Sequence, residues 1–430
     1  VRFFRKVFEI PAGRKIKHAF CAVSADNEYM LFVNERRTRD GNSFKEAVVS
    51  NISEQLKPGK NVIAIQVSNV GEDANPAGVI GVLKVVFETG EPLVIRSDES
   101  WLSFNKGGDY WMNLDMDDSG WTAAKVLGEY GLKPWEEVEV TSGKLFLPPV
   151  QLVRREFTVE KPIVRAMVYA SALGNYELHI NGEQVDDAYF TPGWTDYDVR
   201  VYYNTFDVTE MIKQGGNAIG AMLADGWYSG HIGWKHVRDH YGKNPRVAVQ
   251  LHIDYEDGTE QIITTDGNWK AATGPILEGD FLMGETYDAR EEMPGWAAAG
   301  FDDGGWNSVD VNDSVTPKLE SYPSVLVRPF QEIEPIERTE PKPGVYVFNM
   351  GTNFAGFVRL KVKAEAGAKV VLRFAERLNP DGTIYTTNLR GARATDTYIC
   401  KGGDWEVWQP RFTFHGFQYV EVTGYPGEPK

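Results

Sequence analysis

Short runs in which apolar and polar residues alternate make up most of the chain. Runs rich in Val, Ile, Tyr and Phe are separated by Gly, Pro, Asn and Asp about every ten residues, and convincing helical patterns are missing. A period of two places every second side chain on the same face, as a sheet with one buried face requires. Regular turns between short strands are typical of sandwiches, so we predict an all-β fold.

The first two thirds of the chain contains the same pattern twice. Four blocks return in the same order: SADNEYMLFVN (24–34) as SALGNYELHIN (171–181), NISEQLKPGKNVIAIQV (51–67) as DVTEMIKQGGNAIGAML (207–223), SDESW (97–101) as TDGNW (265–269), and DDSGW (117–121) as DDGGW (302–306). This order indicates two related jelly-roll sandwiches. The spacing between equivalent residues grows along the chain, so the second copy carries insertions of about 38 residues in total.

Two stretches rich in proline and charge divide the chain. They are residues 131–149 and 333–344, and such composition marks extended, exposed connections. We therefore predict three consecutive β-sandwich (jelly-roll-like) domains at 1–135, 145–332 and 340–430, the first two related as an internal repeat.

Charge and hydropathy exclude two classes of partner. A formal net charge of −16 argues against nucleic acid, because nucleic-acid binding relies on Lys and Arg at the phosphates. The longest apolar runs, such as residues 79–87, have the length of a strand and contain charge, so we predict no membrane partner. Cys21 and Cys400 lie in apolar strand-like contexts and are expected to be buried free thiols.

Aromatic and acidic residues gather in the insertions of the second copy. Aromatic rings stack on the C–H face of a pyranose, and carboxylates bind its hydroxyls. The candidate sugar-binding residues are Trp194, Asp196, Asp225, Trp227, Tyr228 and Trp234. Packing against a neighbouring domain is the alternative, and we favour it for any single one of these aromatic residues.

Three histidines on one loop of the second copy suggest a metal site at first sight. The spacing of His231, His236 and His240 matches no zinc pattern, and there are no cysteine partners. We expect solvated loop histidines.

The C-terminal third carries the most specific motifs. Residues 351–362 (GTNFAGFVRLKV), 372–382 (LRFAERLNPDG) and 382–424, together with 170–234, closely resemble bacterial α-L-rhamnosidases of glycoside hydrolase family 78. In that family the 382–424 passage belongs to a β-domain directly before a helical catalytic barrel. The resemblance implies that this chain stops where that barrel begins.

The resemblance also implies a function for the parent protein. It would be an inverting enzyme that removes terminal α-L-rhamnose from glycosides or polysaccharides, with a carboxylic acid that protonates the leaving oxygen and a carboxylate that activates water. The chain would then be its non-catalytic N-terminal portion, with a scaffold role and a capacity to bind carbohydrate. Its implied partners are rhamnose-containing glycosides or polysaccharides and the absent C-terminal catalytic barrel. No cofactor is required.

Four residues of the first sandwich resemble a metal site. Asp26, Asn27, Asn69 and Pro76 are similar to the ligands of carbohydrate-binding module family 67, a calcium-dependent, rhamnose-binding, galactose-binding-like sandwich. Oxygen ligands of this type suit Ca²⁺. Phe44 stands where that module has its sugar-stacking Trp. The alternative is an Asx turn in an ordinary sandwich.

Catalytic residues are not predicted within the chain. Asp288, Glu291 and Glu292 lie close together, but the resemblance places them in an accessory sandwich, where an exposed acidic loop is expected. Arg390 and Arg393 would either reach toward substrate or pin the barrel, and we favour pinning. Two rival interpretations remain: a stand-alone lectin-like carbohydrate-binding protein, and an enzyme that uses an undetected carboxylate pair.

Overall fold

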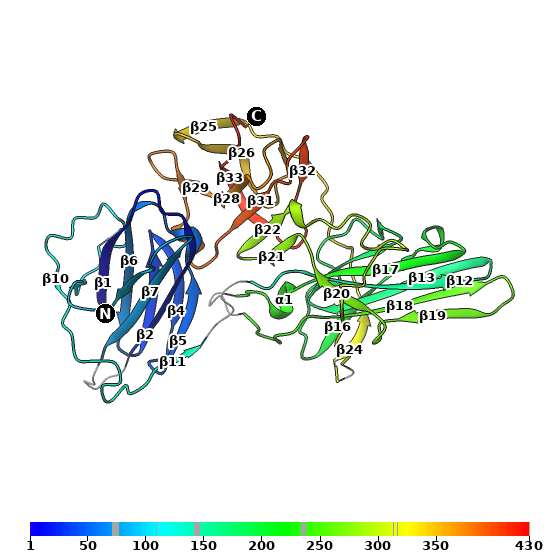
Figure 1. Ribbon diagram of the computed structural model, residues 1–430, viewed down its shortest axis with the longest axis horizontal. Coiled ribbons are helices and arrows are strands. Elements are labelled where there is room, and N and C mark those ends of the chain that lie inside the picture. The colour runs from blue at the N-terminus through cyan, green and yellow to red at the C-terminus, as the bar shows by residue number, and fades with distance from the viewer. Residues whose placement is uncertain are drawn as a thin grey trace. The chain divides into compact units, whose positions relative to one another are not determined.

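The chain folds into two compact units whose regular elements are almost all strands. The structure is a computed structural model that describes residues 1–70, 77–108, 110–141, 147–233, 238–312, 314–315 and 317–429. One unit is Val1–Phe146 with Thr386–Gly391, and the other is Leu147–Tyr385 with Ala392–Lys430. The predicted all-β fold is confirmed (Figure 1). The described part contains no helix that is long and apolar enough to cross a membrane.

The first unit is a sandwich of two sheets. The six-stranded sheet has the order β10 (Thr122–Ala123), β9 (Leu102–Phe104), β1 (Arg2–Ile10), β6 (Gly59–Ser68), β3 (Glu28–Val33) and β4 (Arg36–Gly41). The five-stranded sheet has the order β11 (Glu139–Thr141), β5 (Glu46–Asn51), β2 (Ile16–Ala25), β7 (Val79–Phe87) and β8 (Leu93–Arg96), and η1 spans Ser53–Gln55. Alternate apolar residues such as Leu31, Val33 and Val85 form the core between the sheets.

The second unit begins with a sandwich of the same topology. Its six-stranded sheet runs β15 (Glu183–Gln184), β14 (Asn175–Ile180), β17 (Gly215–Ala224), β12 (Gln151–Val159), β20 (Lys270–Thr273) and β23 (Asn307–Ser308). Its five-stranded sheet runs β19 (Glu260–Thr264), β18 (Arg246–Tyr255), β13 (Ile163–Leu173), β16 (Arg200–Asp207) and β24 (Lys318–Ser321), with η2 at Thr209–Met211. When these two strand orders are read in reverse, each position corresponds to a strand of the first sandwich, so that β12 is equivalent to β1, β17 to β6 and β13 to β2. Even the outer parallel pairs, β11 with β5 and β24 with β16, are equivalent.

The repeat extends to individual buried hydrogen bonds. Asn181 Nδ2 donates to Asn217 Oδ1 at 2.8 Å, and Asn217 Nδ2 donates to two turn carbonyls at 2.6 and 3.0 Å. In the first sandwich, Asn34 and Asn61 make the same bonds at 2.7 Å, and at 2.7 and 2.9 Å. The two asparagine positions are thus the polar centres that hold the turn before β6 and before β17.

A buried arginine explains the repeated DDSGW and DDGGW blocks. Arg5 in β1 and Arg154 in β12 are almost completely buried, and each pairs with the second aspartate of its block, Asp118 or Asp303. A guanidinium removed from water needs such a partner. The block therefore recurs because it neutralises a charge inside each sandwich.

The last sheet draws on two distant parts of the chain. Its order is β21 (Ile276–Asp280), β22 (Gly284–Asp288), β31 (Thr395–Ile399), β28 (Lys369–Ala375), β33 (His415–Thr423), β26 (Val345–Gly356) and β25 (Glu337–Lys342). Two short ribbons join β27 (Leu360–Val362) with β32 (Glu406–Trp408) and β29 (Arg377–Leu378) with β30 (Ile384–Tyr385), and η3 (Ala289–Glu291) and η4 (Thr387–Leu389) are single turns.

The β21–β22 hairpin is an insertion in the second sandwich, yet it belongs to the last sheet. It lies between β20 and β23 in the chain, and β22 pairs in parallel with β31 at Thr286 with Thr397 and at Asp288 with Ile399 (Figure 1). A sheet built mainly from residues within 340–430 thus takes in a hairpin from the predicted 145–332 domain. The second sandwich and the last sheet consequently share structure.

Substitution of Asn217 by Ala should destabilise the second sandwich. It leaves two turn carbonyls, the Asn181 amide and the backbone N–H of Lys213 without their partner, and each buried polar group left unpaired costs about 1–3 kcal/mol. We expect the free energy of unfolding to fall by roughly 3 kcal/mol, measured by urea denaturation. The exposed Asn268→Ala is the control. A loss for Asn217→Ala no larger than that of the control would contradict the role assigned to Asn217.

Candidate functional site

Three stacked aromatic rings lie where two insertions of the second sandwich meet. Trp227 is in the short helix α1 (Gly226–Ser229), which follows β17. Its ring stacks on Phe281 at a centroid distance of 4.2 Å and an angle of 29°, and on Trp194 at 6.1 Å and 12°. Trp194 is 57% exposed and is the outer ring of this stack. The stack therefore presents one indole to solvent on a rigid base.

Further aromatic side chains hold the inner rings. Phe190 packs edge-on against Trp227 at 6.2 Å and against Phe281 at 5.2 Å, and Phe414 from the last domain contacts both Phe190 and Phe281. Such edge-to-face contacts add stability beyond simple burial. The outer tryptophan thus rests on the aromatic core that joins the second sandwich to the last domain.

The loop that carries Trp194 needs a glycine. Gly193 has a φ of +103°, and a Cβ there would lie 2.5 Å from the ring of Tyr322. A residue with a side chain would be strained by both effects. Gly193 therefore allows the Trp194 loop to approach Tyr322, the residue that follows β24.

A buried ionic network lies beside the stack. Asp225 accepts a hydrogen bond from Arg238 at 2.5 Å, and Asp280 accepts from the backbone N–H and from Nδ1 of His231 at 2.9 and 3.0 Å. Burial acts to raise the pKa of Asp280, but His231 and Arg238 hold it well below its usual range. The network ties the loop after α1 to the β21–β22 hairpin.

The six predicted sugar-binding residues fall into three groups. Trp194 and Asp196 are exposed, and the carboxylate of Asp196 accepts the backbone N–H of Asp198. Asp225 is buried and paired with Arg238, while Trp227 and Tyr228 are half-buried and pack against other rings, Tyr228 against Tyr197 at 5.4 Å. Trp234 lies outside the described residues. A sugar-binding role for these residues stays a prediction.

The predicted calcium ligands make ordinary hydrogen bonds where they are described. Asp26 Oδ2 accepts from Trp135 Nε1 at 3.0 Å, and Asn27 Oδ1 accepts from the backbone N–H of Val70 at 2.7 Å. Asn69 follows β6, and Pro76 lies outside the described residues. Within the described ranges no group of three His, Cys, Asp or Glu side chains is arranged to hold a metal ion. The calcium site stays a prediction.

The prediction of solvated histidines was wrong for His231. Its ring is 13% exposed and bonds to the buried Asp280, because the hairpin brings that carboxylate to the loop. His240 is exposed with its ring against Tyr241, and His236 is not among the described residues.

In the acidic cluster at residues 288–292, two of the carboxylates form ion pairs with basic side chains. Asp288 binds Arg290 through two hydrogen bonds at 2.6 and 2.9 Å, and Glu292 pairs with Lys401 at 2.6 Å. The bonds from Arg290 lower the pKa of Asp288, whereas a general acid needs a raised one. Glu291 is exposed.

Both cysteines are buried free thiols, as predicted. Arg393, for which the sequence left two roles open, donates to Met283 O at 3.0 Å and to Glu278 at 2.6 Å, so its guanidinium holds the β21–β22 hairpin. Sequence reasoning missed this latch because its partners lie more than a hundred residues away in the chain.

A polar seam between the second sandwich and the last domain was also missed. Glu177 in β14 accepts a hydrogen bond from Arg411 at 2.8 Å and contacts His179 at 2.8 Å. Burial acts to raise the pKa of Glu177, but these two partners outweigh it, so the pKa is lowered. The backbone N–H groups of Arg411 and Phe412 both donate to Glu285. The seam thus joins β14, the hairpin and the segment before β33.

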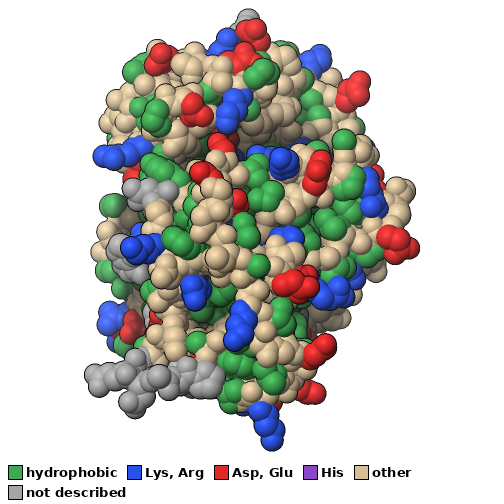
Figure 2. Space-filling view, turned by 90° about the vertical axis from the view of Figure 1, so that its left-hand side faces the viewer, with side chains coloured by type: hydrophobic (Ala, Val, Ile, Leu, Met, Phe, Trp, Pro, Cys, Tyr) green, Lys and Arg blue, Asp and Glu red, His purple; other side chains and the backbone are tan. Residues whose placement is uncertain are grey.

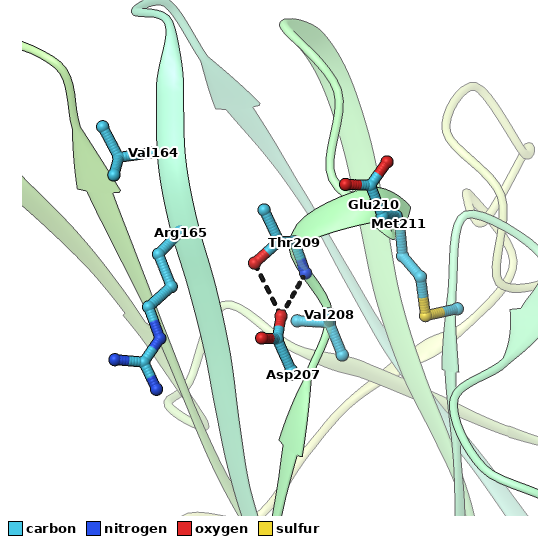
Figure 3. A pocket seen from close by; sticks show the side chains of 7 residues that line it. All are labelled: Val164, Arg165, Asp207, Val208, Thr209, Glu210 and Met211. Carbon is cyan, nitrogen blue, oxygen red and sulfur yellow. Dashed lines mark hydrogen bonds between the residues drawn. The ribbon is translucent and has the colours of Figure 1, made fainter.

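The open pocket at the β16–η2 turn contains none of the predicted site residues. Asp207 accepts the backbone N–H and the hydroxyl of Thr209 at 3.0 and 2.6 Å, which lowers its pKa, and Arg165 and Glu210 are on its rim (Figure 3). The carboxylate of Asp207 therefore serves to close a turn.

On the face shown in Figure 2, acidic and basic side chains are interspersed, without a large patch of either sign.

Comparison with known proteins finds relatives among the α-L-rhamnosidases. The family model of the alpha-L-rhamnosidase N-terminal domain matches residues 161–331, and that of the bacterial alpha-L-rhamnosidase concanavalin-like domain matches 339–430. An α-L-rhamnosidase from Streptomyces avermitilis is 43% identical over 437 residues, which cover 100% of this chain and 41% of the relative. One from Formosa agariphila is 36% identical, over 78% of this chain and 37% of its own length.

Solved structures agree with the sequence comparison. The crystal structure of the S. avermitilis enzyme complexed with L-rhamnose matches with a TM-score of 0.67, over 100% of this chain and 41% of the other. An α-L-rhamnosidase from Dictyoglumus thermophilum, 28% identical, matches with a TM-score of 0.63 over 99% and 47%. The chain spans less than half of the length of each of these relatives.

Two tryptophans of the stack should differ in their contribution to stability. Trp227→Ala removes the middle ring and both stacking contacts, so we expect a loss of roughly 2–4 kcal/mol in the free energy of unfolding. Trp194→Ala removes an exposed ring and should cost less than about 1 kcal/mol. Trp405→Ala, at a site 55% exposed, is the control for loss of an exposed indole. Equal losses at Trp194 and Trp227 in urea denaturation would contradict this division.

Proposed function

Because the chain belongs to the bacterial α-L-rhamnosidase family, glycoside hydrolase family 78, we propose that it is the non-catalytic N-terminal part of an enzyme that hydrolyses terminal α-L-rhamnose from glycosides or polysaccharides. The observation that carries this proposal is the alignment over the whole chain, at 43% identity, to 41% of a protein named as an α-L-rhamnosidase. The substrate class comes from the names of the relatives, and rhamnose-containing glycosides are accordingly the partners that we propose.

A scaffold role for the chain follows from its construction. The shared hairpin, the Arg393 latch and the Glu177–Arg411 pair join the second sandwich to the last domain in one compact unit. A rigid platform of this kind suits the support of a catalytic domain, because catalytic groups must be held in fixed geometry. The proposed partner within the parent protein is its catalytic barrel.

The ion pairs of the acidic cluster at residues 288–292 support the non-catalytic assignment. Inverting hydrolysis needs one carboxylic acid with a raised pKa and one carboxylate base on the two sides of the sugar. In the acidic cluster at residues 288–292, Asp288 and Glu292 are engaged by Arg290 and Lys401. These pairs support a structural use of the cluster.

Carbohydrate binding is the second part of the proposal. Trp194 presents an indole on a rigid stack, and Asp196, two residues further along the same loop, has an exposed carboxylate. An aromatic face and a nearby carboxylate are the groups that a pyranose requires. In the first sandwich, the proposed Ca²⁺ ligands are Asp26, Asn27, Asn69 and Pro76, the last of which lies outside the described residues. A stand-alone lectin is not favoured, because the likeness over the whole chain is to the rhamnosidases.

The purified 430-residue chain should not release the aryl alcohol from an aryl α-L-rhamnoside above the blank rate. Release in proportion to the amount of chain, retained through purification, would overturn the non-catalytic assignment.

Calorimetric titration of the same sample with L-rhamnose, with Ca²⁺ and with chelator, tests the binding part of the proposal separately. If the heat of L-rhamnose binding disappears in Trp194→Ala, the sugar binds at Trp194. If it disappears only when chelator removes Ca²⁺, the sugar binds to the first sandwich. No heat with L-rhamnose under either condition would contradict the binding proposal for this sugar.

A further inference from the structure

Glu285 is a buried acid at the joint between the hairpin and the last sheet. It lies in β22, and its side chain is completely buried. Its Oε2 accepts the backbone N–H groups of Arg411 and Phe412 at 3.0 and 2.9 Å, and its own N–H donates to Asp396 Oδ1 at 3.0 Å. Within the described residues, neither Glu285 Oε1 nor Asp396 Oδ2 has a hydrogen-bond partner.

The charges that face Glu285 do not balance two carboxylates. From β31 it faces Asp396, which also contacts His415 Nε2 of β33 at 3.0 Å. From the segment before β33 it faces Arg411, but that guanidinium is bound to Glu177 of β14 at 2.8 Å. Among the described residues, two phenols also interact with Glu285, those of Tyr189 before β16 and Tyr287 of β22.

A proton on Glu285 would remove one of the two neighbouring negative charges. Two ionised carboxyl groups, each with a buried oxygen that lacks a donor, are costly in a medium of low polarity. Burial raises the pKa of Glu285 to about 8, and the charge of Asp396 acts in the same direction against the two backbone N–H donors. Once the hairpin opens to water, the carboxyl returns to its ordinary pKa of 4.5.

We infer that the closed hairpin holds a proton on Glu285, and that loss of this proton to water releases the β21–β22 hairpin from β31. The joint between the second sandwich and the last domain is therefore sensitive to pH. The closed state binds one proton more than the open state, so its advantage is complete below about pH 4.5 and is lost as the pH rises to about 8. Between these limits the opening equilibrium increases by up to about tenfold per pH unit.

Hydrogen exchange of the intact chain tests this inference. Peptides that cover residues 276–288 should show roughly ten- to hundredfold more opening at pH 7.5 than at pH 5.5, after correction for the intrinsic pH dependence of amide exchange. Peptides from β18 should show little change. Glu285→Gln keeps an acceptor for the two backbone N–H groups and is neutral at every pH, so its hairpin should open to a similar extent at both values.

Glu406→Gln is the matched control. Glu406 is also buried in the last domain and accepts two backbone N–H groups, from Lys401 at 2.9 Å and from Gly402 at 3.2 Å, but each of its oxygens has a partner. This variant should keep the pH dependence of the unmodified chain. Equal hairpin protection at both pH values in the unmodified chain, or an unchanged pH dependence in Glu285→Gln, would overturn the inference.

A second measurement does not depend on the folding of any variant. The unmodified chain is labelled with carbon-13 at the glutamate carboxyl groups, and their NMR chemical shifts are followed with pH. One glutamate carboxyl group should still be protonated at pH 6.5 and should titrate only near pH 8. Complete ionisation of all glutamate carboxyl groups at pH 6.5 would overturn the inference.

Discussion

The parallel pairing of β22 with β31 is the constraint on which the second half of the molecule depends. The pairing places a hairpin from inside the second sandwich at the edge of the last sheet, and it brings Glu285 beside Asp396 and Glu278 beside Arg393. The register of β22 against β31 determines which side chains face one another, so these buried charges meet only if the hairpin is in place. The aromatic stack has the same origin, because Phe281 in the turn of the hairpin forms its base.

The two repeated sandwiches were predictable from the sequence. The repeated blocks predicted two related folds, and the structure adds what two of them do: Asn34 and Asn181 hold equivalent turns, and the aspartate-rich blocks pair with a buried arginine in each sandwich. These features depend on contacts inside one sandwich, where the same local pattern twice produces the same network twice. The topology of the two sandwiches follows from that repeat.

The rest was not predictable, because it depends on residues far apart in the chain. GETYD gives no sign that Glu285 is buried, since the groups that bury it lie more than a hundred residues later. Residue type also does not determine exposure within an insertion: Trp194 and Trp227 were equal candidates, yet one is the outer ring of the stack and the other the middle ring. His231 was expected in solvent for the same reason, and the hairpin supplies the carboxylate that binds it.

The most direct test of the shared hairpin compares two shorter chains. Residues 147–430 contain the hairpin and the last sheet, whereas residues 333–430 carry the last sheet without β21 and β22. The longer chain should unfold cooperatively with a dispersed amide spectrum. The shorter one should lack both, since it exposes the edge of β31 and leaves Asp396 without the N–H of Glu285. Cooperative unfolding and a dispersed spectrum for residues 333–430 alone would contradict the dependence of the last domain on the hairpin.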